Sequence, residues 1–145
     1  MKDYLVLRVI TKLLTPFILL FALYVQFHGD FGPGGGFQAG VIFAAGFILY
    51  SLTYGVSSAQ RILPVGILRA GVASGVLLYA GVGVAGLLLG GNYLDYSVLA
   101  AEAPKGQHLG IFIVEFGVGL TVASVIIVIF FAFAGRDHQM DEIEE

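Results

Sequence analysis

Long apolar stretches alternate with short polar connections along this chain. Four stretches are each long enough to cross the hydrocarbon core of a bilayer as a helix, which takes about 20 residues. They cover residues 9–27, 37–57, 65–90 and 109–134, and an acidic segment at 137–145 follows the last of them. The pattern therefore predicts an all-α integral membrane protein with one domain of four transmembrane helices over residues 1–136, followed by a solvated tail.

The composition agrees with a lipid environment. Hydrophobic residues make up 58% of the 145 positions and charged residues 12%, against roughly 45–50% and about 25% in soluble domains. The mean hydropathy is +0.93, so the chain has too little polar surface to cover a globule in water. The net charge of -3 is concentrated in the tail, which argues against nucleic acid as a partner. The lack of cysteine excludes disulfides and thiolate metal sites.

Basic residues predict how the helices are oriented in the membrane. Six of the seven lie at one set of helix ends, and only Lys105 lies at the other. Because cytoplasmic flanks carry the excess of Lys and Arg, we expect both termini and the 57–64 link to be cytoplasmic. The turn after the first span and the 91–107 loop are then expected to face outward. The chain is predicted to be a multi-pass protein of the plasma membrane.

The segment FHGDFGPGGGFQAG at residues 27–40 is a turn with polar groups between two apolar spans. Its six glycines and one proline disfavour a continuous helix. The N-terminus of the following helix has free N–H groups that suit a carboxylate or another anion. Irregular backbone at membrane depth persists only where it is buried in protein or lines a cavity, so we expect the turn to do one of these. The residues assigned to the turn itself are Pro33, Gly34, Gly35, Gly36 and Phe37.

Small residues recur at helical spacing in the apolar spans, and such stripes allow helices to approach closely. The glycines predicted to pack helices are Gly40, Gly71, Gly75, Gly86 and Gly119. Residues 81–86, GVGVAG, match the letters of a dinucleotide-binding motif. That motif needs a preceding strand and a helix that opens at the third glycine. A 26-residue apolar run offers neither, so we interpret these glycines as packing residues.

Glu115 is the clearest candidate for chemistry, because it interrupts the fourth span. An ionised carboxylate in a span usually faces the bundle interior, a water-filled path or a basic partner. It lies roughly 9 Å inward of Leu109, and His108, two turns earlier, shares its helix face. The pair suits a proton or cation path, and the alternative interpretation is that Glu115 pairs with another subunit purely for assembly. The path candidates are Glu115, His108, Asp30 and His28.

The PGGGF segment at residues 33–37 and the EFGVGLTV segment at residues 115–122 carry a family resemblance. Together with the glycine-rich third span, they resemble the MnhB/MrpB family, one of the subunit families of the multisubunit Mrp-type Na⁺/H⁺ antiporters. The resemblance covers roughly residues 5–134. It implies a non-catalytic subunit in a complex of six or seven different membrane subunits, which transports Na⁺ and H⁺.

We therefore expect a chain that packs through glycine-lined faces against other subunits and helps to form an ion or proton path. We expect it not to be an enzyme, and expect no cofactor and no metal site. Three alternatives stay open at this point: an assembly scaffold without a conducting role, the similar subunit of a membrane-bound hydrogenase-type complex, and a homo-oligomeric small transporter.

Overall fold

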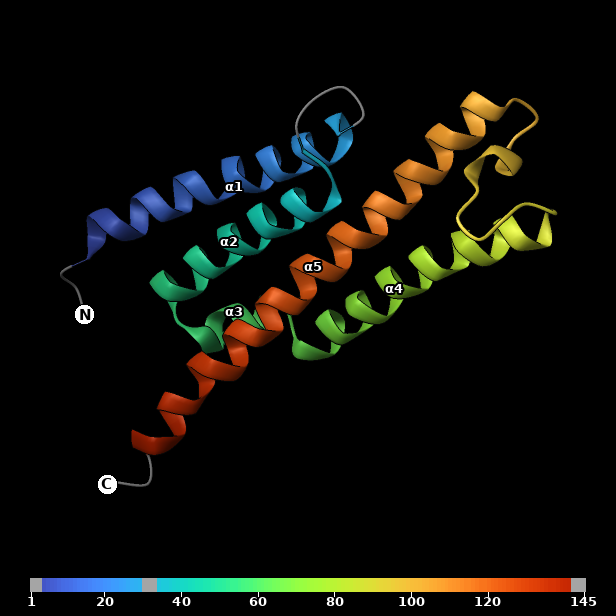
Figure 1. Ribbon diagram of the computed structural model, residues 1–145. Helices are drawn as coiled ribbons and strands as arrows, with labels where there is room; N and C mark the ends of the chain where they lie inside the picture. Colours follow the sequence, from blue (N-terminus) through green and yellow to red (C-terminus); the bar gives the residue numbers. More distant parts are fainter. Residues whose placement is uncertain (1–3, 30–33, 142–145) are drawn as a thin grey trace.

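The computed structural model describes residues 4–29 and 34–141, with side chains as far as Gly135 (Figure 1). Two of the candidate residues, Asp30 and Pro33, lie outside this range. So do residues 142–145 of the acidic tail.

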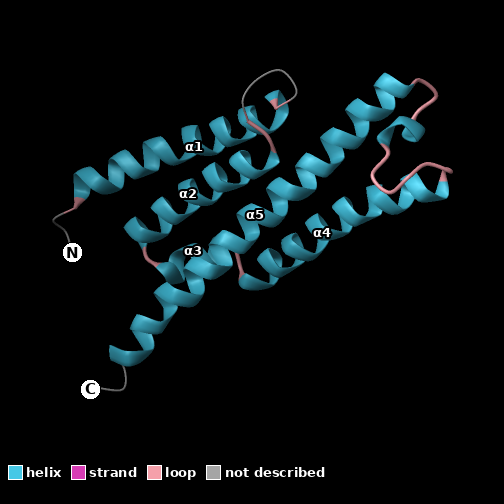
Figure 2. Ribbon diagram, in the orientation of Figure 1, coloured by secondary structure: helices cyan, strands magenta, loops and turns pink. Residues whose placement is uncertain are grey.

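The described chain consists of helices and connecting loops, with no strand among these residues (Figure 2). The order is α1 (Leu5–His28), α2 (Gly36–Tyr54), α3 (Val56–Ile62), α4 (Val65–Leu88), the short 3₁₀ helix η1 (Tyr96–Leu99) and α5 (Ala103–Asp141). Four of them, α1, α2, α4 and α5, are long and apolar enough to cross a membrane. This confirms the predicted all-α fold with four transmembrane helices.

The elements differ from the predicted ranges at their ends. The second span ends at Gly55, whose φ of +91° is a conformation that favours glycine over residues with a β-carbon. The 56–62 segment then forms α3 in place of an irregular link. At the other end of the chain, α5 begins six residues before the predicted start, at Ala103, and runs for 39 residues.

The four long helices lie side by side as a single layer in the order α1, α2, α5, α4 (Figure 1). Neighbours in this order pack extensively, whereas α1 and α4 share no substantial contact in the described part of the chain. Both termini lie at one end of the layer, and the connections α1–α2 and α4–α5 lie at the other (Figure 1). This agrees with an even number of spans, while the assignment of that end to the cytoplasm stays a prediction.

Glycines hold α5 close to both of its neighbours. A β-carbon built on Gly40 of α2 would lie 2.7 Å from the Gly119 carbonyl oxygen of α5. On the other side, β-carbons at Gly71 and Gly75 of α4 would meet the side chains of Ser124 and Thr121. We expected glycine faces to pack against other subunits, but these glycines are used within the chain. Gly86 also packs internally, against the backbone of the loop at Asn92 and Asp95.

The most buried apolar cluster lies toward the end of the layer that carries the termini. There α3 fills the space beside α2, α4 and α5. The cluster consists of Ala44, Phe47, Ala59, Leu68, Ile127 and Phe131. Nearby, the hydroxyls of Thr11 and Thr53 are 3.1 Å apart across α1 and α2, and the Tyr54 hydroxyl donates to the Arg8 carbonyl at 2.8 Å. The end of the layer that carries the termini is thus firmly packed. The glycine turn lies at the other end.

Candidate functional site

The beginning of α2 is in direct contact with the N-terminal third of α5, at Glu115. A β-carbon at Gly36 would collide with the backbone carbonyl of Glu115. Only glycine permits this approach, so Gly36 places the first turn of α2 against the carboxylate-bearing turn of α5. Gly119, one turn further along α5, would in turn bring a β-carbon within 3.1 Å of the Gly36 carbonyl oxygen.

The carboxylate of Glu115 lies in a cradle of glycines. A β-carbon at Gly29 would lie 2.8 Å from its Oε2, and one at Gly35 would lie 2.9 Å from its Oε1. Gly34 has a φ of +141° and lies against Val25 of α1. The absence of side chains at these positions leaves room for the carboxylate between the end of α1 and the start of α2. The two described ends of the turn therefore lie against this half-buried acid.

The start of α2 also has the electrostatic character that suits a carboxylate. The first N–H groups of a helix have no partner within it, and the helix dipole gives this end a partial positive charge. Gly35 is the residue that precedes the first turn of α2, and it is also one of the two glycines that contact the Glu115 carboxylate. The acid of α5 thus lies beside the start of α2.

The two candidate histidines lie on the surface around this site. His28 ends α1, is exposed, and stacks on Tyr24 with 5.1 Å between ring centroids. His108 is exposed on α5, about two turns from Glu115 toward the N-terminal end of that helix. Phe37, the last residue assigned to the turn, is 60% exposed. Among the described residues assigned to the turn, the structure therefore brings Glu115 together with Gly35 and Gly36.

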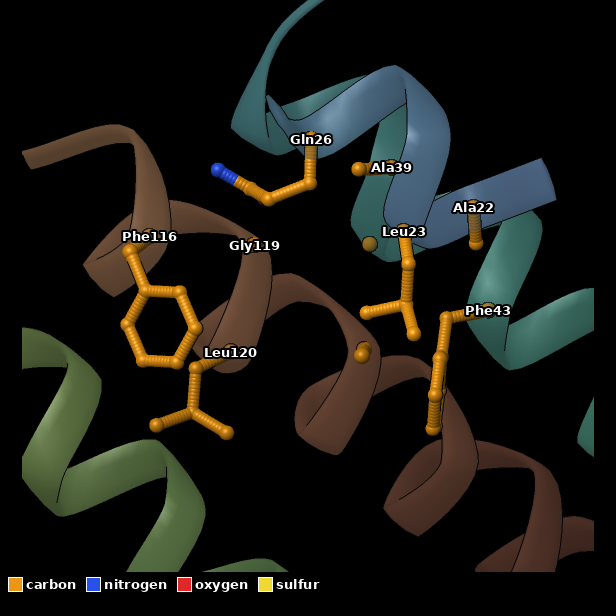
Figure 3. Close-up of a pocket in the computed structure, with 10 residues that line it drawn as sticks. Ala22, Leu23, Gln26, Ala39, Phe43, Phe116, Gly119 and Leu120 are labelled. Atoms are coloured by element: carbon orange, nitrogen blue, oxygen red, sulfur yellow. The ribbon is translucent and has the colours of Figure 1, made fainter. Parts of the chain in front are cut away.

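Gln26 is a polar residue of this region that we did not single out in the sequence. It is only 7% exposed, and its Nε2 atom is buried without a hydrogen-bond partner among the described residues. Figure 3 shows the side chain reaching from α1 toward α5 above Gly119. A β-carbon at Gly119 would lie 2.5 Å from the Gln26 Oε1. The sequence did hold a signal, because Gln26 is the one amide side chain in the first span.

A cavity of about 210 Å³ lies beside Gln26 (Figure 3). Three helices line it, and its lining is almost wholly apolar. The lining residues are Ala22, Leu23 and Gln26 of α1, Ala39, Gly40 and Phe43 of α2, and Phe116, Gly119, Leu120 and Ala123 of α5. Gln26 is the one amide or charged side chain in this set.

A second cavity, of about 180 Å³, lies between α4 and α5. It is lined by Gly75, Val76 and Tyr79 of α4 and by Gly117, Val118, Thr121 and Val122 of α5. At about 100° per residue, these four α5 residues point roughly opposite to those that line the first cavity. The two cavities therefore open on opposite faces of the helix layer.

The donor groups of the described residues do not suggest a metal site. No group of three or more His, Cys, Asp or Glu side chains gathers within the ranges that the structure covers. Glu115 is the ionisable side chain in the contact between α2 and α5 described above. Within the part of the chain that the structure describes, the chemistry of the site is thus that of one carboxylate, a helix N-terminus and glycine backbone.

Comparison with known proteins gives consistent matches. Residues 6–128 match the family model described as a domain related to the MnhB subunit of Na⁺/H⁺ antiporter. A Staphylococcus haemolyticus protein named as antiporter subunit mnhB2 is 32% identical over 133 residues, which cover 90% of this chain and 94% of the relative. A Bacillus subtilis relative, named as the B-type subunit of a Na⁺/H⁺ antiporter, is 30% identical, with 84% and 92% covered. The relative of the same name from Alkalihalophilus pseudofirmus is 31% identical, with 80% and 87% covered.

Proposed function

We propose, from the premise that this chain belongs to the MnhB family of Na⁺/H⁺ antiporter subunits, that Glu115 is part of a proton or cation path. The chain is a multi-pass subunit of a multisubunit antiporter in the cell membrane. Its partners are other membrane subunits. Within such a complex of six or seven subunits, which exchanges Na⁺ for H⁺, its role is non-catalytic in the enzymatic sense.

The observation that carries the proposal is the environment of the Glu115 carboxylate. A carboxylate at this depth costs several kcal/mol if it is ionised without compensation. Here both oxygens lie against glycines, and the partially positive end of α2 lies beside them. The glycines place polar backbone, in place of apolar side chains, against the acid.

The layered arrangement explains why partners are required for this function. A path through a membrane needs walls on all sides, and four helices side by side provide a wall on one side only. Glu115 lies where α2 meets α5, toward the end of the layer away from the termini. Other subunits must therefore complete the enclosure. The relatives described above are named as antiporter subunits, so a hydrogenase-type setting is not favoured.

Glu115→Gln tests the proposal because it keeps the shape of the side chain and removes its titration. We expect a normally assembled complex whose Na⁺-dependent proton flux in membrane vesicles falls by on the order of 10²-fold, a typical effect of losing a positioned proton-transfer group. Glu115→Asp retains an acid and should restore part of the flux.

Glu102→Gln is the matched control, since Glu102 is an exposed acid whose salt bridge to Lys105, at 2.9 Å, lies outside the site. Flux should be unchanged in this variant. If Glu115→Gln instead releases the chain from the complex, the acid serves assembly and the chain is a scaffold. If both flux and assembly are normal, Glu115 has no part in the path.

A further inference from the structure

The cavity beside Gln26 combines an apolar surface with one buried amide that has no hydrogen-bond partner among the described residues. A buried polar group without a hydrogen bond costs about 1–3 kcal/mol, and native structures contain few such groups. The Gln26 side chain is 7% exposed, and its Nε2 has no partner among the described residues. The described part of the chain therefore leaves a hydrogen bond unmade at this point, which an occupant of the cavity can supply.

We propose that this face of the layer is the docking site for a transmembrane helix of another antiporter subunit. That helix inserts one large apolar side chain into the cavity and offers a hydrogen-bond acceptor, a hydroxyl or a carbonyl oxygen, to the Gln26 amide. The inference rests on the chain being an antiporter subunit, and it does not depend on the role of Glu115.

The size and lining of the cavity fit a side chain of this kind. An engineered cavity of about 150 Å³, lined by aliphatic and aromatic side chains, binds benzene, and this one measures about 210 Å³. Its floor consists of small residues, Ala22 and Ala39 among them, together with Gly40 and Gly119, which pack within the chain. A Leu or Phe side chain therefore fits between Leu23, Phe43 and Phe116.

The amide distinguishes a protein helix from the hydrocarbon of the bilayer. Lipid tails fill apolar cavities but contain no hydrogen-bond acceptor, so a tail would not supply the hydrogen bond that the Gln26 amide needs. The terminal torsion of a Gln side chain is broad, so the amide can turn its N–H groups toward an occupant. A polar contact between helices within a membrane is worth about 0.6 kcal/mol on average and at most about 1–2 kcal/mol. The contact thus adds mainly to the specificity of docking.

The opposite face of α5 provides an internal comparison. The second cavity has a similar volume, about 180 Å³, but its hydroxyl at Thr121 already donates to the Gly117 carbonyl at 2.9 Å. Val76 lines that cavity and is 52% exposed, and Leu23 lines the first and is 45% exposed. Probes at these two positions therefore have similar accessibility and report on opposite faces.

Photo-crosslinking in membranes that contain the whole complex tests the proposal. A benzophenone amino acid replaces Leu23 in one variant and Val76 in the other. We expect irradiation to join the Leu23 probe to one other subunit, identified by mass spectrometry, with several-fold lower yield of that adduct from Val76. Adding Gln26→Leu should lower the Leu23 yield and release the partner more readily in detergent. Ser74→Ala is the control, because Ser74 is an exposed residue of α4 whose hydroxyl donates to the Gly71 carbonyl of the same helix. This change should alter neither the Leu23 crosslink yield nor the release of the partner in detergent.

Three results would overturn the proposal: a Leu23 adduct with lipid alone, an adduct with a second copy of this chain, or equal yields of one adduct from Leu23 and Val76. An unchanged Leu23 adduct in the Gln26→Leu variant would remove the amide from the interface. Glu115→Gln should not alter the crosslink, so loss of flux and loss of docking are separate readouts. If the Glu115→Gln complex has normal flux and a normal Leu23 adduct, the proposed role of Glu115 in the path is refuted. The proposed docking site is then retained.

Discussion

At the scale of single residues, the site depends on positions where a side chain is missing. Gly29 and Gly35 make room for the carboxylate oxygens of Glu115, and Gly36 makes room for its backbone. Other glycines of the chain have open space around them, as Gly66 of α4 does. The same residue type therefore has different consequences according to what a β-carbon would meet.

Gly36→Ala is predicted to destabilise the chain by about 1–3 kcal/mol, the usual cost of forcing an extra carbon into a packed contact. The added methyl group would collide with the Glu115 carbonyl and push the start of α2 away from α5. Thermal unfolding of the purified protein in detergent measures the effect. Flux should fall too, because the cradle around the carboxylate opens.

Gly66→Ala is the control for this prediction. Gly66 lies in α4, and no atom outside the local helix approaches its position within 4 Å. Alanine is a better helix former than glycine by about 0.5–1 kcal/mol, so this variant should be as stable as the parent chain or slightly more so. Equal destabilisation of both variants would show that the loss of stability does not come from the contact between Gly36 and Glu115.

At the scale of elements, the loop between α4 and α5 is organised by one capped 3₁₀ helix. The Asp95 side chain precedes η1 and accepts hydrogen bonds from the backbone N–H of Ser97, at 3.1 Å, and from the Ser97 hydroxyl. These bonds favour the charged carboxylate. The bond from the Ser97 hydroxyl is the largest cause that lowers the pKa of Asp95 from its ordinary value of 3.8, followed by the bond from the Ser97 backbone.

The lowered pKa of Asp95 gives a pH-dependent prediction. Because the folded value lies below 3.8, the cap stabilises the fold fully above that pH and loses its effect as the pH falls through the folded pKa. The difference in melting temperature between the parent chain and Asp95→Ala should therefore be largest above pH 3.8 and vanish in stronger acid. A difference that grows on acidification would contradict the assignment. Ser97→Ala should move the loss to a higher pH.

The elements were largely predictable from the sequence, and the parts that were not have physical reasons. Length and hydropathy indicate four spans because hydrocarbon demands about 20 apolar residues. The short helix α3 was missed because seven residues form too little periodic pattern to separate a helix from a link. Glu115 was found because a charge in a span is conspicuous, whereas Gln26 was passed over as one uncharged residue near the end of a span.

At the scale of the whole molecule, the order of the helices in the layer could not be predicted from the sequence. In water, an apolar stripe shows which side of a helix faces its neighbours. In lipid, both the protein-facing and the lipid-facing sides are apolar, and small residues are the main remaining signal. The glycines at positions 40, 71 and 75 indicated close packing, but they did not show that α5 would lie between α2 and α4.

The direction of the layer in the membrane is testable because the chain has no cysteine of its own. Single substitutions Ser58→Cys, in α3, and Ala101→Cys, before α5, place one thiol at exposed positions near each end of the layer. The excess of basic residues at the terminal end predicts that this end is cytoplasmic. In intact cells, a membrane-impermeant maleimide should label Ala101→Cys and not Ser58→Cys. The reverse pattern would invert the topology.

The layer of helices is one helix thick, so groups on its two faces are about 10–12 Å apart, the diameter of a helix with its side chains. Two neighbouring subunits seated on opposite sides of this chain would thus hold their charged groups close enough to interact. At 0.1 M ionic strength the screening length is about 10 Å in water, and screening is much weaker between buried groups. A proton bound on one side would then alter the affinity for a cation on the other, without any movement of the helices between them.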